Sequence, residues 1–331
     1  MKDEGTTSKA PLTEAFAEWG NLRIVLIALF GAVMGQAVVW YTGQFYALFF
    51  LEKMLKVDGA TTNILIAIAL ALATPGFVFF GWLSDKIGRK PIILSGCAIA
   101  ALLYFPLFTA LTSAANPELA QAQATSPVTV VAHQDECSFQ FDPVGKNKFD
   151  AKSCDIVKAF LVKSGVSYHN GEAPAGTIAH VSIGGTSITA PDPSKVTGDD
   201  RKAAITAFQD QAKAALKAAG YPEKANPATM NKPLVVFILF ILVVLVTAVY
   251  GPIAALLVEL FPSRIRYTSM SLPYHIGNGW FGGFLPTLAF AMVAATGDIY
   301  YGLWYPIIVA ALTVILGLFF LPETFRRKIE G

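Results

Sequence analysis

A stripe of amide and aromatic side chains interrupts an otherwise apolar stretch near the start of the chain. Gln36, Trp40 and Gln44 follow one another at intervals of four residues, and Tyr41 adjoins Trp40. Residues at this spacing share one face of a helix. Amides form hydrogen bonds and an indole ring attracts a cation, so this face could bind a small zwitterion or carboxylate. The alternative is that the aromatic rings anchor the helix at a membrane interface while the amides bond neighbouring helices.

A second polar face is expected later in the chain. Tyr274 and Asn278 are four residues apart, and His275 adjoins Tyr274. Because imidazole titrates near neutral pH, His275 is a candidate contact for a proton or an anion, although a buried histidine bonded to a neighbour would explain it equally well. The predicted substrate-binding residues are therefore Gln36, Trp40, Tyr41, Gln44, Tyr274, His275 and Asn278.

Charged residues gather in the segment 81–91, which reads Gly-Trp-Leu-Ser-Asp-Lys-Ile-Gly-Arg-Lys-Pro. Gly81 allows a close helix approach and Gly88 permits a tight turn, while the proline suits the first turn of a following helix. Asp85 can cap a helix or pair with Arg89. We expect this loop to lock helix ends together, the alternative being that its basic residues only fix orientation in a membrane.

Further charges are expected to complete this lock. Glu259 and Glu323 are interpreted as partners for arginines, in ion pairs that break and re-form between states. The predicted gating residues are Gly81, Asp85, Gly88, Arg89, Lys90, Glu259, Arg264, Arg266 and Glu323.

Long apolar stretches must position all these residues. Hydrophobic residues make up 54% of the chain and charged residues 15%, and mean hydropathy is +0.53. Crossing a bilayer takes about 20 residues of helix. Six stretches are long enough and lack the alternation of barrel strands, so we predict six membrane-spanning helices. They cover about 22–51, 60–83, 91–113, 233–258, 267–295 and 300–321.

Small and helix-breaking residues mark several of these helices. Pro75-Gly76 and Gly251-Pro252 interrupt two of them, as hinges or as tolerated kinks. The pairs Gly31-x-x-x-Gly35 and Gly279-x-x-x-Gly283 are typical of close helix packing.

The basic residues predict the orientation. Eleven lie on one side of the predicted membrane and only Lys53 and Lys56 in the short loops opposite, so both termini should be cytoplasmic. The first apolar run is too long for a signal peptide, so no cleavage is expected. The eleven are Lys2, Lys9, Arg23, Lys86, Arg89, Lys90, Arg264, Arg266, Arg326, Arg327 and Lys328.

The segment 114–232 breaks the apolar pattern with 12 Lys/Arg and 12 Asp/Glu in 119 residues. We predict an insert outside the cytoplasm, with strands at 127–132, 138–141 and 178–189. One helix should begin with Ser153 as N-cap and end at Gly165, burying Ile156, Phe160 and Leu161. A second should follow Asp199 and end before Gly220, burying Ile205, Phe208, Ala212 and Leu216.

Two of the three cysteines lie in this insert. Cys137 and Cys154 are 17 residues apart, and an oxidising compartment would favour a disulfide worth about 3 kcal/mol in the chain-entropy model. Two free thiols are the alternative. Cys97 lies in an apolar run and is expected to be a small buried hydrophobe.

Several of these segments together resemble a known family. The 81–91 loop is similar to the hallmark loop of the major facilitator superfamily, and Glu-Leu-Phe-Pro-Ser-Arg-Ile-Arg-Tyr-Thr at 259–268 resembles its second conserved loop. Pro-Glu-Thr at 322–324 is similar to the ending of sugar-porter-like members. The stretch 35–47 resembles the seventh helix of the metabolite:proton symporters, which carry proline, betaine, citrate, oxoglutarate and shikimate.

The resemblance implies a half-carrier. Members have two six-helix halves around a midplane site, and this chain is similar to the C-terminal half, with residues 1–21 as the remains of a central linker and Met1 as a new start. The expected fold class is an all-α membrane protein with a small extracytoplasmic α/β insert. The expected parts are a cytoplasmic segment 1–21, helices in 22–113, an insert with linkers in 114–232, helices in 233–321 and a cytoplasmic tail 322–331.

The expected function is secondary active transport of a small polar metabolite by alternating access, coupled to protons as the resemblance implies, in a bacterial inner membrane. The partners would be the lipid bilayer, the solute, H⁺, and an N-terminal half or a second copy. A non-transporting fragment and a membrane anchor for an exterior binding domain are the alternatives.

Other function classes have no support in the sequence. His133, His169 and His180 show no spacing of a metal or catalytic set, so no enzyme, metal site or cofactor is expected. Phosphate-binding loops, nucleotide fingerprints and basic nucleic-acid patches are missing, so neither ATP-driven transport nor a nucleic-acid partner is expected.

Overall fold

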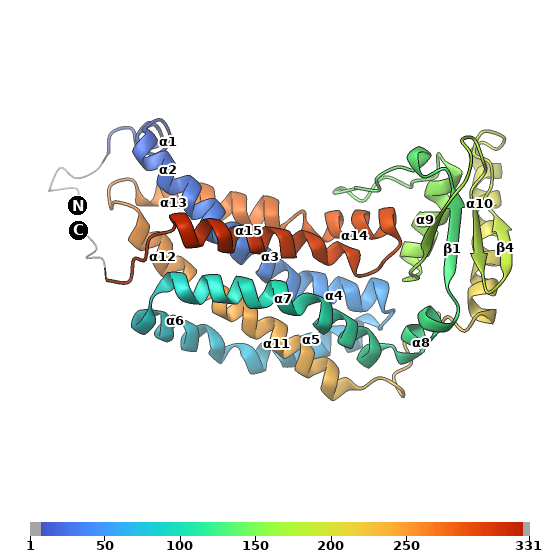
Figure 1. Cartoon of the computed structure of the whole chain (residues 1–331), viewed down its shortest axis with the longest axis horizontal. Coiled ribbons are helices and arrows are strands. Elements are labelled where there is room, and N and C mark those ends of the chain that lie inside the picture. Colours follow the sequence, from blue (N-terminus) through green and yellow to red (C-terminus); the bar gives the residue numbers. More distant parts are fainter. Residues whose placement is uncertain (1–7, 327–331) are drawn as a thin grey trace.

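Six long apolar helices run side by side in the computed structural model, which describes residues 8–326 (Figure 1). All six predicted spans are confirmed as helices long and apolar enough to cross a membrane, and most extend a few residues beyond the predicted bounds. They are Trp19–Met54, Gly59–Ile87, Arg89–Ala115, Lys232–Leu260, Arg266–Thr296 and Tyr301–Phe320. Lys2, Arg327 and Lys328, which were counted for the orientation, lie outside the described residues, as does Met1.

Most spans are built from more than one helical segment. The short helix α1 (Pro11–Phe16) precedes the first span. In that span α2 (Trp19–Ala28), α3 (Met34–Tyr41) and α4 (Ala47–Phe49) are joined by the π-helical turns η1 (Leu29–Val33) and η2 (Thr42–Tyr46), and a third π-helical turn, η3 (Phe50–Met54), ends it. The next two spans are α5 (Gly59–Ala73) with α6 (Pro75–Ile87), and α7 (Arg89–Ala115). The last three are α11 (Lys232–Tyr250) with α12 (Ile253–Leu260); α13 (Arg266–Ile276), η5 (Gly277–Gly282) and α14 (Leu285–Thr296); and η6 (Tyr301–Leu303) with α15 (Trp304–Phe320).

Two of the helix breaks face each other. A side chain at Gly76 would meet Thr247, and one at Gly251 would lie 3.1 Å from the carbonyl oxygen of Phe77. The breaks at Pro75-Gly76 and Gly251-Pro252 therefore let the second and fourth spans approach closely.

The two glycine pairs differ in their surroundings. Gly31 packs against Gly317 of α15, with 3.4 Å between its Cβ position and the Gly317 Cα. The Cβ position of Gly279 has no neighbour within 4 Å, and that of Gly283 faces its own helix. The packing predicted for the second pair is therefore absent within the described chain.

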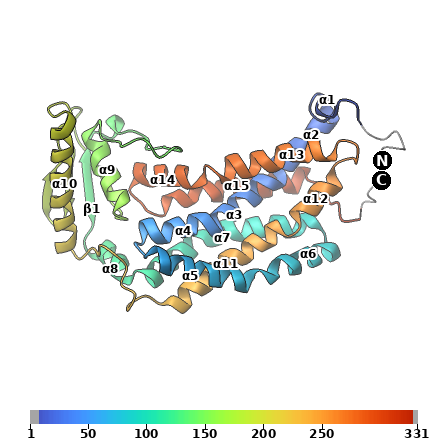
Figure 2. The same cartoon turned by 180° about the vertical axis from the view of Figure 1, so that it is seen from behind.

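The two ends of the helix bundle carry different parts. The α6–α7 loop, the α12–α13 loop, the helix α1 that begins the described chain and the segment after α15 that ends it lie at one end, and the segment 126–225 lies at the other (Figures 1 and 2). This arrangement agrees with the alternation that six spans impose. Which end faces the cytoplasm stays a prediction.

A four-stranded sheet forms the centre of the insert. Its strands are β1 (Val128–Ala132), β2 (His169–Glu172), β3 (His180–Ile183) and β4 (Thr186–Thr189), in the order β2-β1-β3-β4, with β1 and β2 parallel and the other pairs antiparallel. Alternate residues of β1 and β3 are buried. The rings of Phe160 and Phe208 lie 6.0 Å apart, so α9 (Ser153–Lys163) and α10 (Gly198–Ala218) pack on the same face. The other helical pieces are α8 (Pro117–Thr125) and η4 (Gln134–Glu136).

Several local predictions in the insert were wrong. Residues 138–141 form no strand, because the backbone amide of Ser138 donates to the Asp155 carboxylate instead of to a sheet neighbour. The predicted strand 178–189 is a hairpin that turns at Gly184-Gly185, where φ is 54° and 86°. Strand β2 was missed because His-Asn-Gly-Glu carries no apolar alternation.

The helix ends of the insert were predicted with partial success. Lys152, not Ser153, is the N-cap of α9, and the Ser153 hydroxyl accepts a hydrogen bond from the Ala179 amide at 3.1 Å. Gly165 ends this helix as predicted, with φ 70°. In α10, Phe208, Ala212 and Leu216 are buried but Ile205 is only half-buried.

The predicted disulfide is present between Cys137 and Cys154, whose Cα atoms are 5.5 Å apart. It ties the loop after β1 to the first turn of α9. Cys97 is buried and unpaired, as expected.

The insert caps the end of the fifth span. The last carbonyls of α14 receive hydrogen bonds from the Tyr168 hydroxyl (2.5 Å to Ala294), the Asn170 amide (3.0 Å to Ala295) and the Lys158 ammonium (3.3 Å to Ala295). Burial lowers the pKa of Lys158, against the opposing effect of Asp155. A helix C-terminus favours such donors because its carbonyls lack partners and carry partial negative charge.

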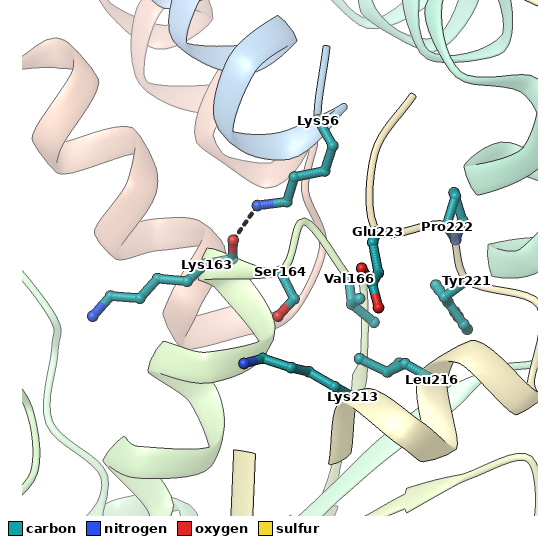
Figure 3. Close-up of a pocket in the computed structure, with 9 residues that line it drawn as sticks. All are labelled: Lys56, Lys163, Ser164, Val166, Lys213, Leu216, Tyr221, Pro222 and Glu223. Atoms are coloured by element: carbon teal, nitrogen blue, oxygen red, sulfur yellow. Dashed lines mark hydrogen bonds between the residues drawn. The ribbon is translucent and has the colours of Figure 1, made fainter. Parts of the chain in front are cut away.

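The chain just after the first span also forms a hydrogen bond with the insert. Lys56, in the left-handed region with φ 58°, donates from its ammonium to the carbonyl of Lys163 at the end of α9 (Figure 3). Burial, and secondly the charge of Lys53, lowers the pKa of Lys56 to about 8. A cavity of about 290 Å³ adjoins this contact, bordered by Lys213 and Tyr221. The insert thus holds the ends of the first and fifth spans together.

Candidate functional site

Amide side chains of the first and fifth spans meet inside the bundle. The Gln36 amide nitrogen lies 3.4 Å from the Asn278 carbonyl oxygen, and the Asn278 amide donates to the Tyr274 carbonyl at 2.8 Å. Gln36 is fully buried, and its own carbonyl oxygen has no partner among the described residues. An unsatisfied buried acceptor costs about 1–3 kcal/mol, so this oxygen favours a ligand with an N–H or O–H donor.

Aromatic rings border the amides. The hydroxyls of Tyr274 and Tyr250 are 3.0 Å apart, and the Tyr250 ring lies 4.3 Å from Trp40 and 5.9 Å from Phe77. The faces of such rings attract cations. Sequence reasoning missed Tyr250 and Phe77, although each adjoins a helix break that had been noted.

Three predicted residues lie apart from this cluster. Tyr41 packs against Phe45 at 5.2 Å and fills the space beside Gly282. Gln44 is half-buried, and its side chain makes no hydrogen bond within residues 8–326. His275 is exposed, with its ring edge-on to Tyr274 at 5.6 Å. The structure therefore brings together Gln36, Trp40, Tyr274 and Asn278 of the predicted set and leaves these three outside.

The predicted gate centres on Arg89. Its guanidinium is 2.5 Å from Asp85 and 3.0 Å from Glu259, and it donates to the Ser84 hydroxyl at 2.5 Å. Thr324 donates to the other Glu259 oxygen at 2.6 Å. Arg89 is 8% exposed, so its charge is stabilised by these partners and little by water. Sequence reasoning missed Ser84 and Thr324, although they lie in the motif segments 81–91 and 322–324.

Other predicted ion pairs take different forms. Glu323 pairs with no arginine side chain in the described chain. It accepts the backbone amides of Arg89 and Lys90, at 2.9 and 3.1 Å, and so caps the N-terminus of α7. Arg264 forms its ion pair with Glu14, and Arg266 donates to the Phe261 carbonyl at 3.1 Å.

The remaining gating residues have structural explanations. Gly88 has φ 110°, and a side chain there would strike Glu323, so only glycine fits. The Lys90 ammonium donates to the carbonyls of Leu318 and Leu321 at the end of α15, at 2.9 and 2.8 Å. The Cβ position of Gly81 is open, so the expected close packing is not seen there. Pro91 is the third residue of α7, within its first turn.

Comparisons with known proteins match both sides of the insert. The Major Facilitator Superfamily model matches residues 2–130, and the Sugar (and other) transporter model matches residues 212–331. No solved structure matches the chain.

Individual relatives are transporters by name. A protein of Staphylococcus haemolyticus assigned as a proline/betaine transporter is 35% identical over 92 residues, which is 28% of this chain and 20% of the relative. The glycine betaine/proline/ectoine/pipecolic acid transporter OusA of Dickeya dadantii is 30% identical over 93 residues, 28% of this chain and 18% of the relative. The matched stretch thus spans at most a fifth of these relatives' length. With six apolar helices and family matches on both sides of the insert, the chain is a multi-pass membrane protein that belongs to the major facilitator superfamily.

Proposed function

We propose that this chain is the C-terminal half of a secondary transporter that moves a small zwitterion or carboxylate by alternating access. The buried Gln36 carbonyl without a partner, beside Asn278 and three aromatic rings, is the observation that supports this proposal most directly. The names of the relatives suggest solutes of the proline and betaine kind.

The proposed site suits such a solute chemically. The amides of Gln36 and Asn278 would bind the carboxylate or a secondary ammonium through hydrogen bonds. The faces of Trp40 and Tyr250 would attract the cationic end. Because the site has no formally charged side chain, it suits a zwitterion of zero net charge better than a carboxylate anion.

The Arg89 cluster would act as the gate at the end of the bundle that holds the termini. Arg89 links the α6–α7 loop to Glu259 of α12, and Glu323 and Thr324 join the chain after α15 to the same cluster. Because these groups come from three spans, breaking the cluster would release the spans to move relative to one another.

Proton coupling is part of the proposal, with its acid on a second unit. In the described spans Glu52, Asp85 and Glu259 lie within the last turns, away from mid-membrane. An N-terminal half would therefore supply the proton-accepting carboxylate. We propose a bacterial inner membrane with both termini cytoplasmic and the disulfide-bonded insert outside, where oxidising conditions favour the disulfide.

Binding to the purified full chain tests the site, and co-reconstitution tests the half-carrier. Proline, whose secondary ammonium can donate to the Gln36 carbonyl oxygen, should bind the detergent-solubilised protein. Gln36→Leu should weaken this binding about tenfold, as expected for one lost hydrogen bond of about 1.4 kcal/mol. Gln44→Leu on the same span is the matched control and should bind normally. Uptake should need an N-terminal half or a second copy, and should rise with an inward proton gradient. Equal binding by wild type and Gln36→Leu would overturn the site.

A further inference from the structure

A groove runs between the first and last spans at the end of the bundle that holds the termini. Two adjoining cavities of about 250 and 360 Å³ form it, and both are bordered by Trp19, Arg23, Ile27 and Phe320. The helices approach closely at Gly31 and Gly317, where neither residue has a side chain. Next to this contact, larger side chains such as Phe30 and Phe320 form the walls of the groove.

The groove is apolar along its length and cationic at its mouth. Below Arg23 it is lined by Leu26, Ile27, Phe30, Leu316 and Phe320. Trp19, Arg23 and Ile27 follow at intervals of four residues, so they share one face of α2, with the cation between an indole ring and the apolar part. A cation at the mouth followed by an apolar groove complements a phospholipid, whose phosphate lies at one end of its acyl chains.

Arg23 differs from three other arginines at this end. Arg89, Arg264 and Arg266 each bind a carboxylate or a carbonyl. Arg23 is exposed, and within residues 8–326 its side chain forms no ion pair or hydrogen bond. Its guanidinium therefore keeps all its donors for a ligand, and phosphate is a bidentate acceptor that fits it.

We infer that this groove binds one anionic phospholipid. The phosphate lies between the Arg23 guanidinium and the Trp19 indole N–H, and one acyl chain lies along Ile27, Phe30 and Leu316. The lipid also contacts Pro322, which lines the larger cavity and directly precedes Glu323. Bound lipid thus supports the segment that holds the Arg89 cluster. The inference does not depend on the proposed transport function or on which end faces the cytoplasm.

Native mass spectrometry of the purified full chain tests the site. The probes are phosphatidylglycerol and phosphatidylcholine with the same acyl chains. Wild type should retain phosphatidylglycerol in preference, because the choline cation of phosphatidylcholine offsets the attraction of its phosphate to Arg23. Arg23→Gln should reduce phosphatidylglycerol retention roughly tenfold, equivalent to about 1.4 kcal/mol, and phosphatidylcholine retention much less, so that the preference is lost. Lys86→Gln, which removes another exposed cation at the same end, should change neither.

A second variant tests the acyl-chain part. Leu316→Trp fills the groove and should reduce retention of both long-chain lipids. Equal retention of the two lipids by wild type, or an unchanged preference in Arg23→Gln, would show ordinary boundary lipid and overturn the site. Displacement of phosphatidylglycerol by millimolar inorganic phosphate would show an anion site without a lipid chain and would also overturn it.

Discussion

Replacing Glu259 with Gln should destabilise the bundle more than the matching change at Asp85 or Glu323, the other carboxylates of the Arg89 cluster. Glu259 accepts two hydrogen bonds from Arg89, at 3.0 and 3.4 Å, and one from Thr324 at 2.6 Å. Its side chain is 10% exposed and that of Arg89 is 9% exposed, so water can replace little of what is lost. Gln keeps the shape and one acceptor but removes the charge.

The expected loss follows from this burial. Removing one partner of a buried ion pair costs about 3–5 kcal/mol, because the other charge stays buried. Asp85 remains 2.5 Å from Arg89 and compensates in part, so we expect about 2–3 kcal/mol for Glu259→Gln. The Asp85 side chain is 60% exposed, so Asp85→Asn should cost at most about 1 kcal/mol. Glu323→Gln weakens a charged helix cap and should fall between them, at about 1–2 kcal/mol.

Equilibrium unfolding in mixed detergent micelles measures this order directly. The free energy of unfolding should fall least for Asp85→Asn and most for Glu259→Gln, with near-native helix content in all three variants before unfolding. A loss for Glu259→Gln no larger than for Asp85→Asn would refute the reasoning, because it would mean that Arg89 is solvated and does not depend on Glu259.

Three further predictions concern the insert. Cys154→Ala removes a disulfide worth about 3 kcal/mol in the chain-entropy model, so limited proteolysis should cut the loop before α9 faster than in wild type. Asn170→Ala exposes two carbonyls at the end of α14, and hydrogen exchange in its last turn should rise, whereas the exposed Lys195→Ala should leave exchange there unchanged. The pKa of His133 is raised: desolvation of its ring lowers it, but the hydrogen bonds of the ring to Glu172 and to the Ala173 carbonyl raise it by more. Protonated His133 therefore stabilises the folded protein fully below the unfolded pKa of about 6.5, and this stabilisation is lost as pH rises through the folded pKa. In wild type Tm should fall across this pH range, and in Glu172→Gln the fall should be smaller.

Much of the transmembrane layout could be predicted because hydropathy and charge are local signals. The number of spans and the position of the insert follow from the cost of burying polar backbone and charged side chains in hydrocarbon. The disulfide partners were also predictable, since only two cysteines lie in the insert. The sheet was harder, because β2 is polar and is stabilised by pairing with β1 rather than by its own pattern.

The contents of the candidate site depended on how helices pack. Trp40 and Gln44 share a helix face in sequence, yet the π-helical turn at Thr42–Tyr46 changes the rotation between them, and only Trp40 meets Tyr250. Likewise, Glu259 pairs with Arg89, 170 positions away, while Arg264, only five residues from Glu259, pairs with Glu14.

The sequence by itself determined that the chain has six spans, which loops share an end of the bundle, and where a polar insert interrupts the helices. These features depend on transfer free energies and turn geometry within short stretches of chain. Only the tertiary structure decided that Tyr250 joins the amide cluster, that His275 is exposed at its edge, and that the insert caps α14. Such contacts are set by helix rotation and crossing, and these result from packing between residues far apart in the sequence.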